Sequence, residues 1–286
     1  MSAVAVATSS SVQDPDALAL LEALGRRGLD AQLVAWDAPV RFDRYDLVVI
    51  RSTWDYVARR NDFLAWARSI EHLANPYWAI EYSSDKHYLA DLAARGHRVV
   101  ETVFCDVGDE PSFVEGDVVV KPAVGAGSGG AARYGAHERE AAARHVEALH
   151  RDGRDALIQP YVSSVDTRGE RAVIVIDGEI THAMTKAAML NVEESVRTAQ
   201  FRRDQMSRAE LEPEVRDYVE GLLGDERFGD LLYARVDLVA TDAGWALMEL
   251  ELVEPNLFLT YDEAALERLA SAIARSVGVD PAPRVA

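Results

Sequence analysis

Three carboxylates near the C-terminal end have the spacing of a metal site. Glu249 and Glu251 are two residues apart in the segment MELEL, so on a β-strand both point to the same face. Asp237 should face them from the preceding strand of a hairpin that turns near residues 242–243. Three like charges on one face, with no lysine to balance them, repel unless a cation joins them. Hard oxygen ligands suit Mg²⁺, especially where it also holds phosphates. The pattern predicts a magnesium site; the alternative is the solvated outer face of an edge hairpin.

Lysine is rare in this chain. Of its 30 basic residues only Lys86, Lys121 and Lys186 are lysines. A lysine that persists among arginines indicates a position that needs a compact point charge rather than a planar fork. The alternative is that the three lysines have no common role.

A glycine-rich loop, GAGSGG, spans residues 125–130 and follows a predicted strand that carries Lys121. The same letters fit the dinucleotide pattern G-x-G-x-x-G, but that site needs a helix at the third glycine, and here the next helix is predicted from residue 137. A flap whose backbone N–H groups fold over phosphates fits better, and a plain surface turn remains an alternative. The residues expected to contribute are Gly125, Gly127, Ser128 and Gly129.

Two arginines and one histidine could contact a substrate. Arg235 lies two residues before Asp237 and therefore on the same strand face, and Arg171 lies at the start of the first predicted hairpin. Either guanidinium could grip a carboxylate or an acyl phosphate; the alternative for each is a surface ion pair. His182, in the first hairpin, could act as a general base or line the substrate site, although a lone histidine is more often structural.

The N-terminal part of the chain, residues 1–82, has the pattern of an open α/β unit. Short apolar runs at 3–7, 31–35 and 46–50 predict strands, and helices are predicted between and after them. Open α/β sheets bind ligands at the carboxyl ends of their strands. Ser52, Thr53 and Asp55 follow the third strand in the segment RSTWDY, so we expect them to bind the substrate.

Residues 83–286 predict a second unit. Strands are expected at 97–104, 117–123 and 156–162, helices at 84–95, 137–150 and 262–277, and hairpins at 171–184 and 231–252. The first hairpin turns on Asp177-Gly178, a strong two-residue turn signal. The polar segment 189–206 lacks a period and is predicted to be a loop beside the active site.

Composition limits the class of protein. The chain has 286 residues, 49% of them apolar, a formal charge of -18 and one cysteine, Cys105. A single cysteine excludes a disulfide scaffold and fits a reducing cytoplasm. The sequence shows neither a run of membrane-spanning length nor a signal peptide, and its acidity argues against a nucleic-acid partner. We therefore expect a cytoplasmic enzyme with a small-molecule substrate; a homo-oligomer stays open.

The ordered set of Lys86, Lys121, the glycine-rich loop, QPYV and the Asp…Glu-x-Glu carboxylates resembles the ATP-grasp superfamily, in its glutathione-synthetase-like branch. The resemblance implies an ATP-grasp domain at 83–286 with a lid subdomain at about 117–158, after an N-terminal α/β domain on the substrate side. It implies ATP phosphates at Lys86 and Lys121, with Lys186 at the γ-phosphate or the substrate. It also implies adenine contacts at Gln159, Tyr161 and Val162 and a ribose contact at Asp166. Magnesium, expected as two ions, would bind Asp237, Glu249 and Glu251, the last standing where the family usually has asparagine.

The segments RSTWDY and MELELVEPNLFL resemble a bacterial subgroup that includes the cyclo-ligase closing O-ureido-D-serine into D-cycloserine, an antibiotic. That likeness implies ATP-dependent activation of a carboxylate as an acyl phosphate, followed by attack of a nitrogen of the same molecule. Two alternatives stay open: a ligase that joins a carboxylate to a separate amine, and a nucleotide-binding module without ligase activity.

Overall fold

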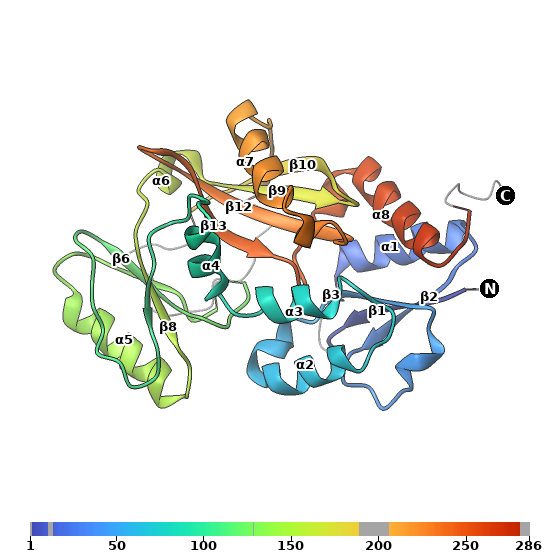
Figure 1. Cartoon of the computed structure of the whole chain (residues 1–286), viewed down its shortest axis with the longest axis horizontal. Helices are drawn as coiled ribbons and strands as arrows, with labels where there is room; N and C mark the ends of the chain where they lie inside the picture. The colour runs from blue at the N-terminus through green and yellow to red at the C-terminus, as the bar shows by residue number, and fades with distance from the viewer. Residues whose placement is uncertain (1, 11–13, 128, 189–205, 281–286) are drawn as a thin grey trace.

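The computed structural model describes residues 2–10, 14–127, 129–188 and 206–280. Its strands form three sheets, which lie side by side along the molecule with helices packed on them (Figure 1). The N-terminal sheet lies at one end, and at the other end lies a sheet that we name the lid sheet after the predicted lid subdomain. The largest sheet, the central sheet, lies between them. The arrangement confirms the predicted α/β class.

The N-terminal sheet is parallel, in the order β2-β1-β3-β4. Its first strand is almost fully buried, as a parallel strand covered on both faces should be. Asp14 caps the first helix by accepting the Asp16 N–H, and a proline opens that helix as predicted. The elements are β1 (Ala3–Thr8), α1 (Pro15–Arg26), β2 (Asp30–Ala35), β3 (Leu47–Ser52), α2 (Arg60–Arg68) and β4 (Leu73–Ala74).

The region after this sheet corrects the predicted helix at 84–95. The structure has α3 (Tyr77–Ser83) before that range and a shorter helix, α4 (Tyr88–Ala94), within it. Ser84 ends the first of them rather than starting the second, and its N–H bonds to the carbonyl of Ile80. Pro76 is the reason, because a proline breaks the preceding strand but is well placed at the start of a helix.

The central sheet has the order β11-β10-β9-β12-β13 and is antiparallel. The predicted turn at Asp177-Gly178 is confirmed, with φ of 53° and 73°, the left-handed values that a two-residue hairpin turn requires. The elements are β9 (Glu170–Ile176), β10 (Glu179–Lys186), β11 (Met206–Ala209), α7 (Pro213–Leu223), β12 (Tyr233–Thr241), β13 (Gly244–Glu251) and α8 (Glu263–Ser276).

The lid sheet has the order β5-β8-β6-β7 and one covering helix. The strand predicted at 97–104 is only three residues long, because Val99 instead bridges to Leu247 of β13. Because β5 belongs to it, the lid sheet includes residues before 117, where the lid was expected to begin. The elements are β5 (Val103–Cys105), β6 (Val118–Pro122), β7 (Ala132–Tyr134), α5 (Arg139–Arg151) and β8 (Ala156–Pro160).

One hydrophobic core joins the N-terminal sheet to the central sheet. It contains Val6 and Leu20 from the N-terminal unit together with Ile174 and Leu269 from the rest of the chain. The C-terminal helix α8 lies against α1 (Figure 1). The two units predicted to meet at residue 82 therefore share packing. None of the helices in the described ranges combines the length and the apolar character that a membrane span requires.

Candidate active site

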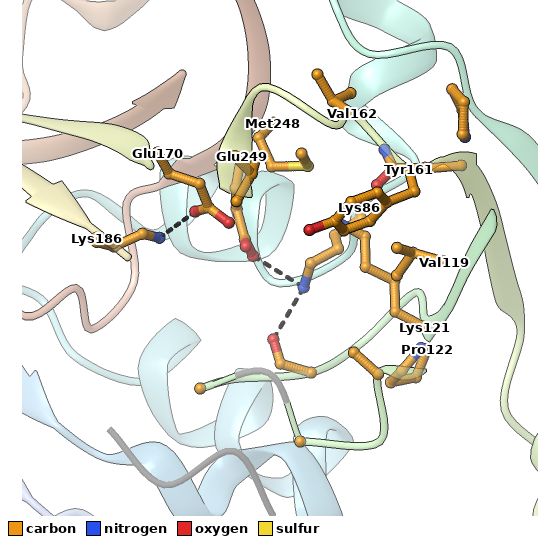
Figure 2. Close-up of a pocket in the computed structure, with 17 residues that line it drawn as sticks. Lys86, Val119, Lys121, Pro122, Tyr161, Val162, Glu170, Lys186, Met248 and Glu249 are labelled. Atoms are coloured by element: carbon orange, nitrogen blue, oxygen red, sulfur yellow. Dashed lines mark hydrogen bonds and ion pairs between the residues drawn. The ribbon is translucent and has the colours of Figure 1, made fainter. Parts of the chain in front are cut away.

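A pocket lies between the lid sheet and the central sheet, and all three lysines of the chain line it (Figure 2). The lid contributes β6, the glycine-rich loop and the end of β8, and the central sheet contributes β9, β10 and β13. Segments up to about 160 residues apart in sequence thus meet at one place. The polar lining residues are Lys86, Lys121, Gln159, Tyr161, Glu170, Lys186 and Glu249.

The three carboxylates of the last hairpin come together as their spacing predicts. Asp237 is in register with Glu249, and Glu251 is one pair further along the same face. One oxygen of each lies within 4.8 Å of the others. Asp237 is 0% exposed, so this face is not the solvated outside of an edge hairpin. The site offers three clustered hard oxygen ligands.

Cations on β10 and β12 balance these carboxylates, which corrects the expectation that no lysine does so. Lys186 Nζ lies 2.7 Å from Asp237 Oδ2 and 2.7 Å from Glu170 Oε2. Arg235 Nε donates to Asp237 Oδ1 at 2.9 Å, and its Nη2 contacts Glu251. Lys186 and Glu170 are in register across the first hairpin, so folding places this charge beside a residue 51 positions away in sequence.

The carboxylates have different proton affinities. Burial alone would raise the pKa of Asp237, but Arg235 and Lys186 lower it to about 2. Burial raises the pKa of Glu251 to about 7, and Arg235 only partly offsets this effect while Glu249 adds to it. For Glu249, Lys86 and Lys121 outweigh burial and lower its pKa. A metal ion would favour the charged form of Glu251, the carboxylate whose ionisation the fold supports least.

Lys86 lies between the carboxylates and the glycine-rich loop (Figure 2). Its Nζ is 3.0 Å from Glu249 Oε1 and donates to the Gly125 carbonyl at 2.9 Å. Lys121 is the less well compensated cation, because burial lowers its pKa to about 8 despite the nearby Glu249. A phosphate group would supply the negative charge that Lys121 lacks.

The expected nucleotide residues lie around the same pocket. Gly125, Gly127 and Gly129 line it, whereas Ser128 lies outside the described residues. Gly127 has a φ of 58°, a backbone conformation that favours glycine. The predicted loop at 189–206 also falls almost entirely outside the described ranges.

The predicted adenine hinge lines the other side of the pocket. Tyr161 and Val162 follow β8, and Gln159 donates through Nε2 to Thr102 Oγ1 at 2.8 Å. Asp166 accepts a hydrogen bond from the Tyr161 hydroxyl and is 46% exposed, so it lies at the rim, where a ribose could reach it.

Arg171 is not in the pocket, which corrects its predicted catalytic position. Side chains alternate along a strand, and Glu170 faces the pocket, so Arg171 points to the opposite face of β9. There its Nη2 lies 2.7 Å from Glu212, and its guanidinium stacks on Trp245. Arg171 fastens α7 to the sheet.

The residues predicted to bind substrate have mixed environments. Ser52 is 0% exposed and its Oγ shares a hydrogen bond with Thr8, while the buried Thr53 Oγ1 has no partner among the residues that the structure describes. Asp55 already accepts from Trp36 and Arg59.

His182 is buried on β10. It pairs with Ile174 of β9, which on its other side pairs with Arg235 of β12. Burial lowers its pKa, and its Nε2 has no partner in the part of the chain that the structure describes. It stays a prediction as a substrate contact.

Comparison with known proteins identifies the family. Residues 4–75 match the family described as the N-terminal domain of D-cycloserine synthetase DcsG. The cycloserine biosynthesis protein DcsG of Streptomyces lavendulae is 36% identical over 282 residues, which cover 91% of this chain and 93% of that protein. The chain belongs to the DcsG family. The crystal structure of D-cycloserine synthetase DcsG superposes with a TM-score of 0.88, at 31% identity over 96% of this chain and 99% of that one.

More distant structures show that the DcsG-family chain has the ATP-grasp fold. D-alanine–D-alanine ligase from Bacillus anthracis, complexed with ATP, has a TM-score of 0.64 at 13% identity, covering 97% of each chain. A RimK domain ATP-grasp protein from Sphaerobacter thermophilus has a TM-score of 0.63 at 16% identity, covering 96% of this chain and 99% of its own. The ATP-grasp fold that the resemblance implied is confirmed, in a chain that belongs to the DcsG family.

Two acidic residues of the site were missed by the sequence analysis. Glu170 pairs with Lys186, and the predicted turn at Asp177-Gly178 already sets that register, so the pair could have been found. Glu254 lies in the segment after β13 and is 8% exposed. Its burial depends on packing between the N-terminal unit and the central sheet, for which the sequence offers no local signal.

Proposed function

We propose that this protein catalyses the ATP-dependent ring closure of O-ureido-D-serine to D-cycloserine. The observation that carries the proposal is 36% identity to a cycloserine biosynthesis protein along nearly the whole of both chains. The pocket supports it, because lysines, a glycine-rich loop and clustered carboxylates suit ATP and a divalent cation. The buried free cysteine agrees with a cytoplasmic site of action.

The clustered carboxylates fit magnesium. Asp237, Glu249 and Glu251 supply oxygen ligands within 4.8 Å of one another, and Mg²⁺ prefers carboxylates together with phosphate oxygens. We propose that they hold two ions. Bound magnesium would neutralise charge on the phosphate oxygens as the phosphoryl group is transferred.

ATP is proposed to enter between the lid and the central sheet. Lys86 and Lys121 would bind its phosphates together with backbone N–H groups of Gly125, Gly127, Ser128 and Gly129. Gln159, Tyr161 and Val162 would hold adenine, and Asp166 the ribose. The support is their common placement around the pocket, apart from Asp166 at its rim and Ser128 outside the described residues.

In the proposed reaction the substrate carboxylate attacks the γ-phosphorus of ATP, and ADP leaves. Arg235 and Lys186 would hold the carboxylate and the transferred phosphoryl group, since both cations lie on the sheet face that carries the metal ligands. The ureido nitrogen bonded to oxygen then attacks the acyl carbon, and inorganic phosphate leaves as the ring closes. Loss of the carbamoyl group consumes one water and yields carbon dioxide and ammonia.

Holding both reacting groups in one bound molecule favours the cyclisation. No second partner has to be captured, and effective molarities for well-oriented groups reach about 10⁵ M or more. The protein's remaining task is to activate the carboxylate and keep the chain bent.

ADP release distinguishes this proposal from an intermolecular ligase. We expect O-ureido-D-serine alone to support ADP formation in the presence of ATP and Mg²⁺, without stimulation by added amines or amino acids. ADP formation that depends on a second amine would show that the protein joins two molecules instead.

A further inference from the structure

A buried carboxylate beside the pocket has no role in the steps above. Glu254 lies in the segment 252–258, which follows β13, and the residue is 8% exposed. Its backbone is fixed from the N-terminal unit: the Glu254 carbonyl accepts from Trp54 Nε1 at 3.1 Å, and the next carbonyl, of Pro255, accepts from Arg51 Nη2 at 2.9 Å. Within the described ranges, no cation and no hydrogen-bond donor contacts its carboxylate.

The electrostatic neighbours of Glu254 are groups of the pocket. Burial, with the charges of Glu251 and Glu249, raises the pKa of Glu254 to about 8, although Lys86 and Arg235 oppose the shift. Burying a carboxylate without a partner is unfavourable, so a fold that places one beside an active site leaves it available to a ligand.

Other unpartnered polar atoms lie at the adjoining edge of the N-terminal sheet. Ser9 and Thr53 follow β1 and β3, are 2% and 0% exposed, and have hydroxyls that find no partner in the described part of the chain. The two strand ends are neighbours, since the Ser9 N–H donates to the Ser52 carbonyl at 3.0 Å. Arg51 holds Nε and Nη1 in the same unsatisfied state. Ligands of open α/β sheets bind at such carboxyl ends.

We propose that Glu254 binds the α-ammonium group of the amino-acid substrate, with the Ser9 and Thr53 hydroxyls beside it for the polar end of the side chain. This inference rests on the proposed function, which supplies a substrate with one cationic group. The lysines and Arg235 suit the substrate carboxylate and the phosphates of ATP, and the three clustered carboxylates are proposed to bind magnesium. Among the acids of the site in the described ranges, Glu249, Glu170, Asp237 and Glu251 each contact a cation, which leaves Glu254 to receive one.

The test compares O-ureido-D-serine with its analogue that lacks the amino group, on the wild type and on Glu254→Gln. For the wild type, loss of the ammonium should raise the substrate KM by about 10- to 100-fold, the range for a charge-assisted hydrogen bond. Glu254→Gln should raise KM for the amino acid by a similar factor and leave KM for the analogue and for ATP unchanged. The matched control Glu110→Gln, which removes an exposed carboxylate from a lid loop, should change neither.

Three results would overturn the inference. They are a wild type that uses both compounds equally, a Glu254→Gln variant that loses the same factor on both, and a loss confined to kcat on both, which would mark Glu254 as a base. Glu254→Asp, which keeps the charge, should recover part of the affinity, and its thermal unfolding checks the fold. If the wild type cyclises nothing but shows the same Glu254-dependent preference for another amino acid, the proposed function fails and the ammonium site stands.

Discussion

Lys186 is the buried cation whose removal the structure predicts most sharply. Its Nζ lies 2.7 Å from both Asp237 and Glu170, and its side chain is 9% exposed. Although burial opposes it, the two carboxylates raise the pKa of Lys186 above the ordinary value, so the amine is charged at neutral pH. Lys186→Met keeps most of the volume and leaves Glu170 without that cation, while Arg235 still binds Asp237.

Removing one member of a buried ion pair lowers the free energy of unfolding by about 3–5 kcal/mol. Because Arg235 still pairs with Asp237, we expect a loss of about 3 kcal/mol. In a chain of this size about 1 kcal/mol corresponds to about 2–4 °C, so Tm should fall by about 6–12 °C. Mg²⁺ should raise the Tm of the variant more than that of the wild type, because a cation then replaces the one that was lost.

Thermal unfolding followed by circular dichroism, with and without Mg²⁺, measures both effects. The control is Arg216→Met, which breaks an exposed pair with Glu220 at 3.5 Å and should change stability by less than about 0.5 kcal/mol. The reasoning is refuted if Lys186→Met unfolds at the wild-type temperature, or if its loss equals that of the control.

Four further predictions concern the same site and the segments around it. Glu249→Gln should lower ADP production by about 100-fold or more in a protein that stays folded, because a metal ligand is lost; full activity would remove the metal assignment. Backbone amide exchange at Gly127 should slow when a non-hydrolysable ATP analogue binds, and equal exchange would count against a phosphate loop. Because the pKa of Lys121 is lowered to about 8, kcat/KM for ATP should fall between pH 7 and 9 in the wild type but not in Lys121→Arg; identical profiles would contradict this. Since Glu254 has its pKa raised to about 8 from 4.5, the folded state binds more protons than the unfolded state between these values, and its stability falls as pH rises. By pH 9, Glu254→Gln should remove on the order of 2–4 kcal/mol of this pH-dependent fall in the free energy of unfolding. Parallel curves of stability against pH for the variant and the wild type would contradict this.

Local pattern was enough to predict the parts of the site that lie on one hairpin. The period of two along β13 placed Glu249 and Glu251 on one face, and the turn near residues 242–243 placed Asp237 opposite them. The rarity of lysine marked three residues that the structure brings to a single pocket.

What the sequence could not predict depends on packing between distant elements. Arg171 was expected in the site, but Glu170 takes the face of β9 that points to the pocket, so Arg171 points to the other face. There it pairs with Glu212 at the start of α7, a helix that the sequence analysis did not predict. The charge balance at Asp237 required the strand order β10-β9-β12, which brings Lys186 across the sheet. Glu254 is buried by contacts with Trp54 and its neighbours, about 200 residues earlier in the chain.

The central claim is that this protein activates the substrate carboxylate as an acyl phosphate and closes a ring within one molecule. The most direct measurement uses O-ureido-D-serine labelled with ¹⁸O in both carboxylate oxygens and follows phosphate and amino-acid products by mass spectrometry. Attack of the carboxylate on ATP predicts one ¹⁸O in each phosphate released, and one ¹⁸O retained in D-cycloserine. Unlabelled phosphate, or labelled phosphate without any cyclic product, would contradict the account.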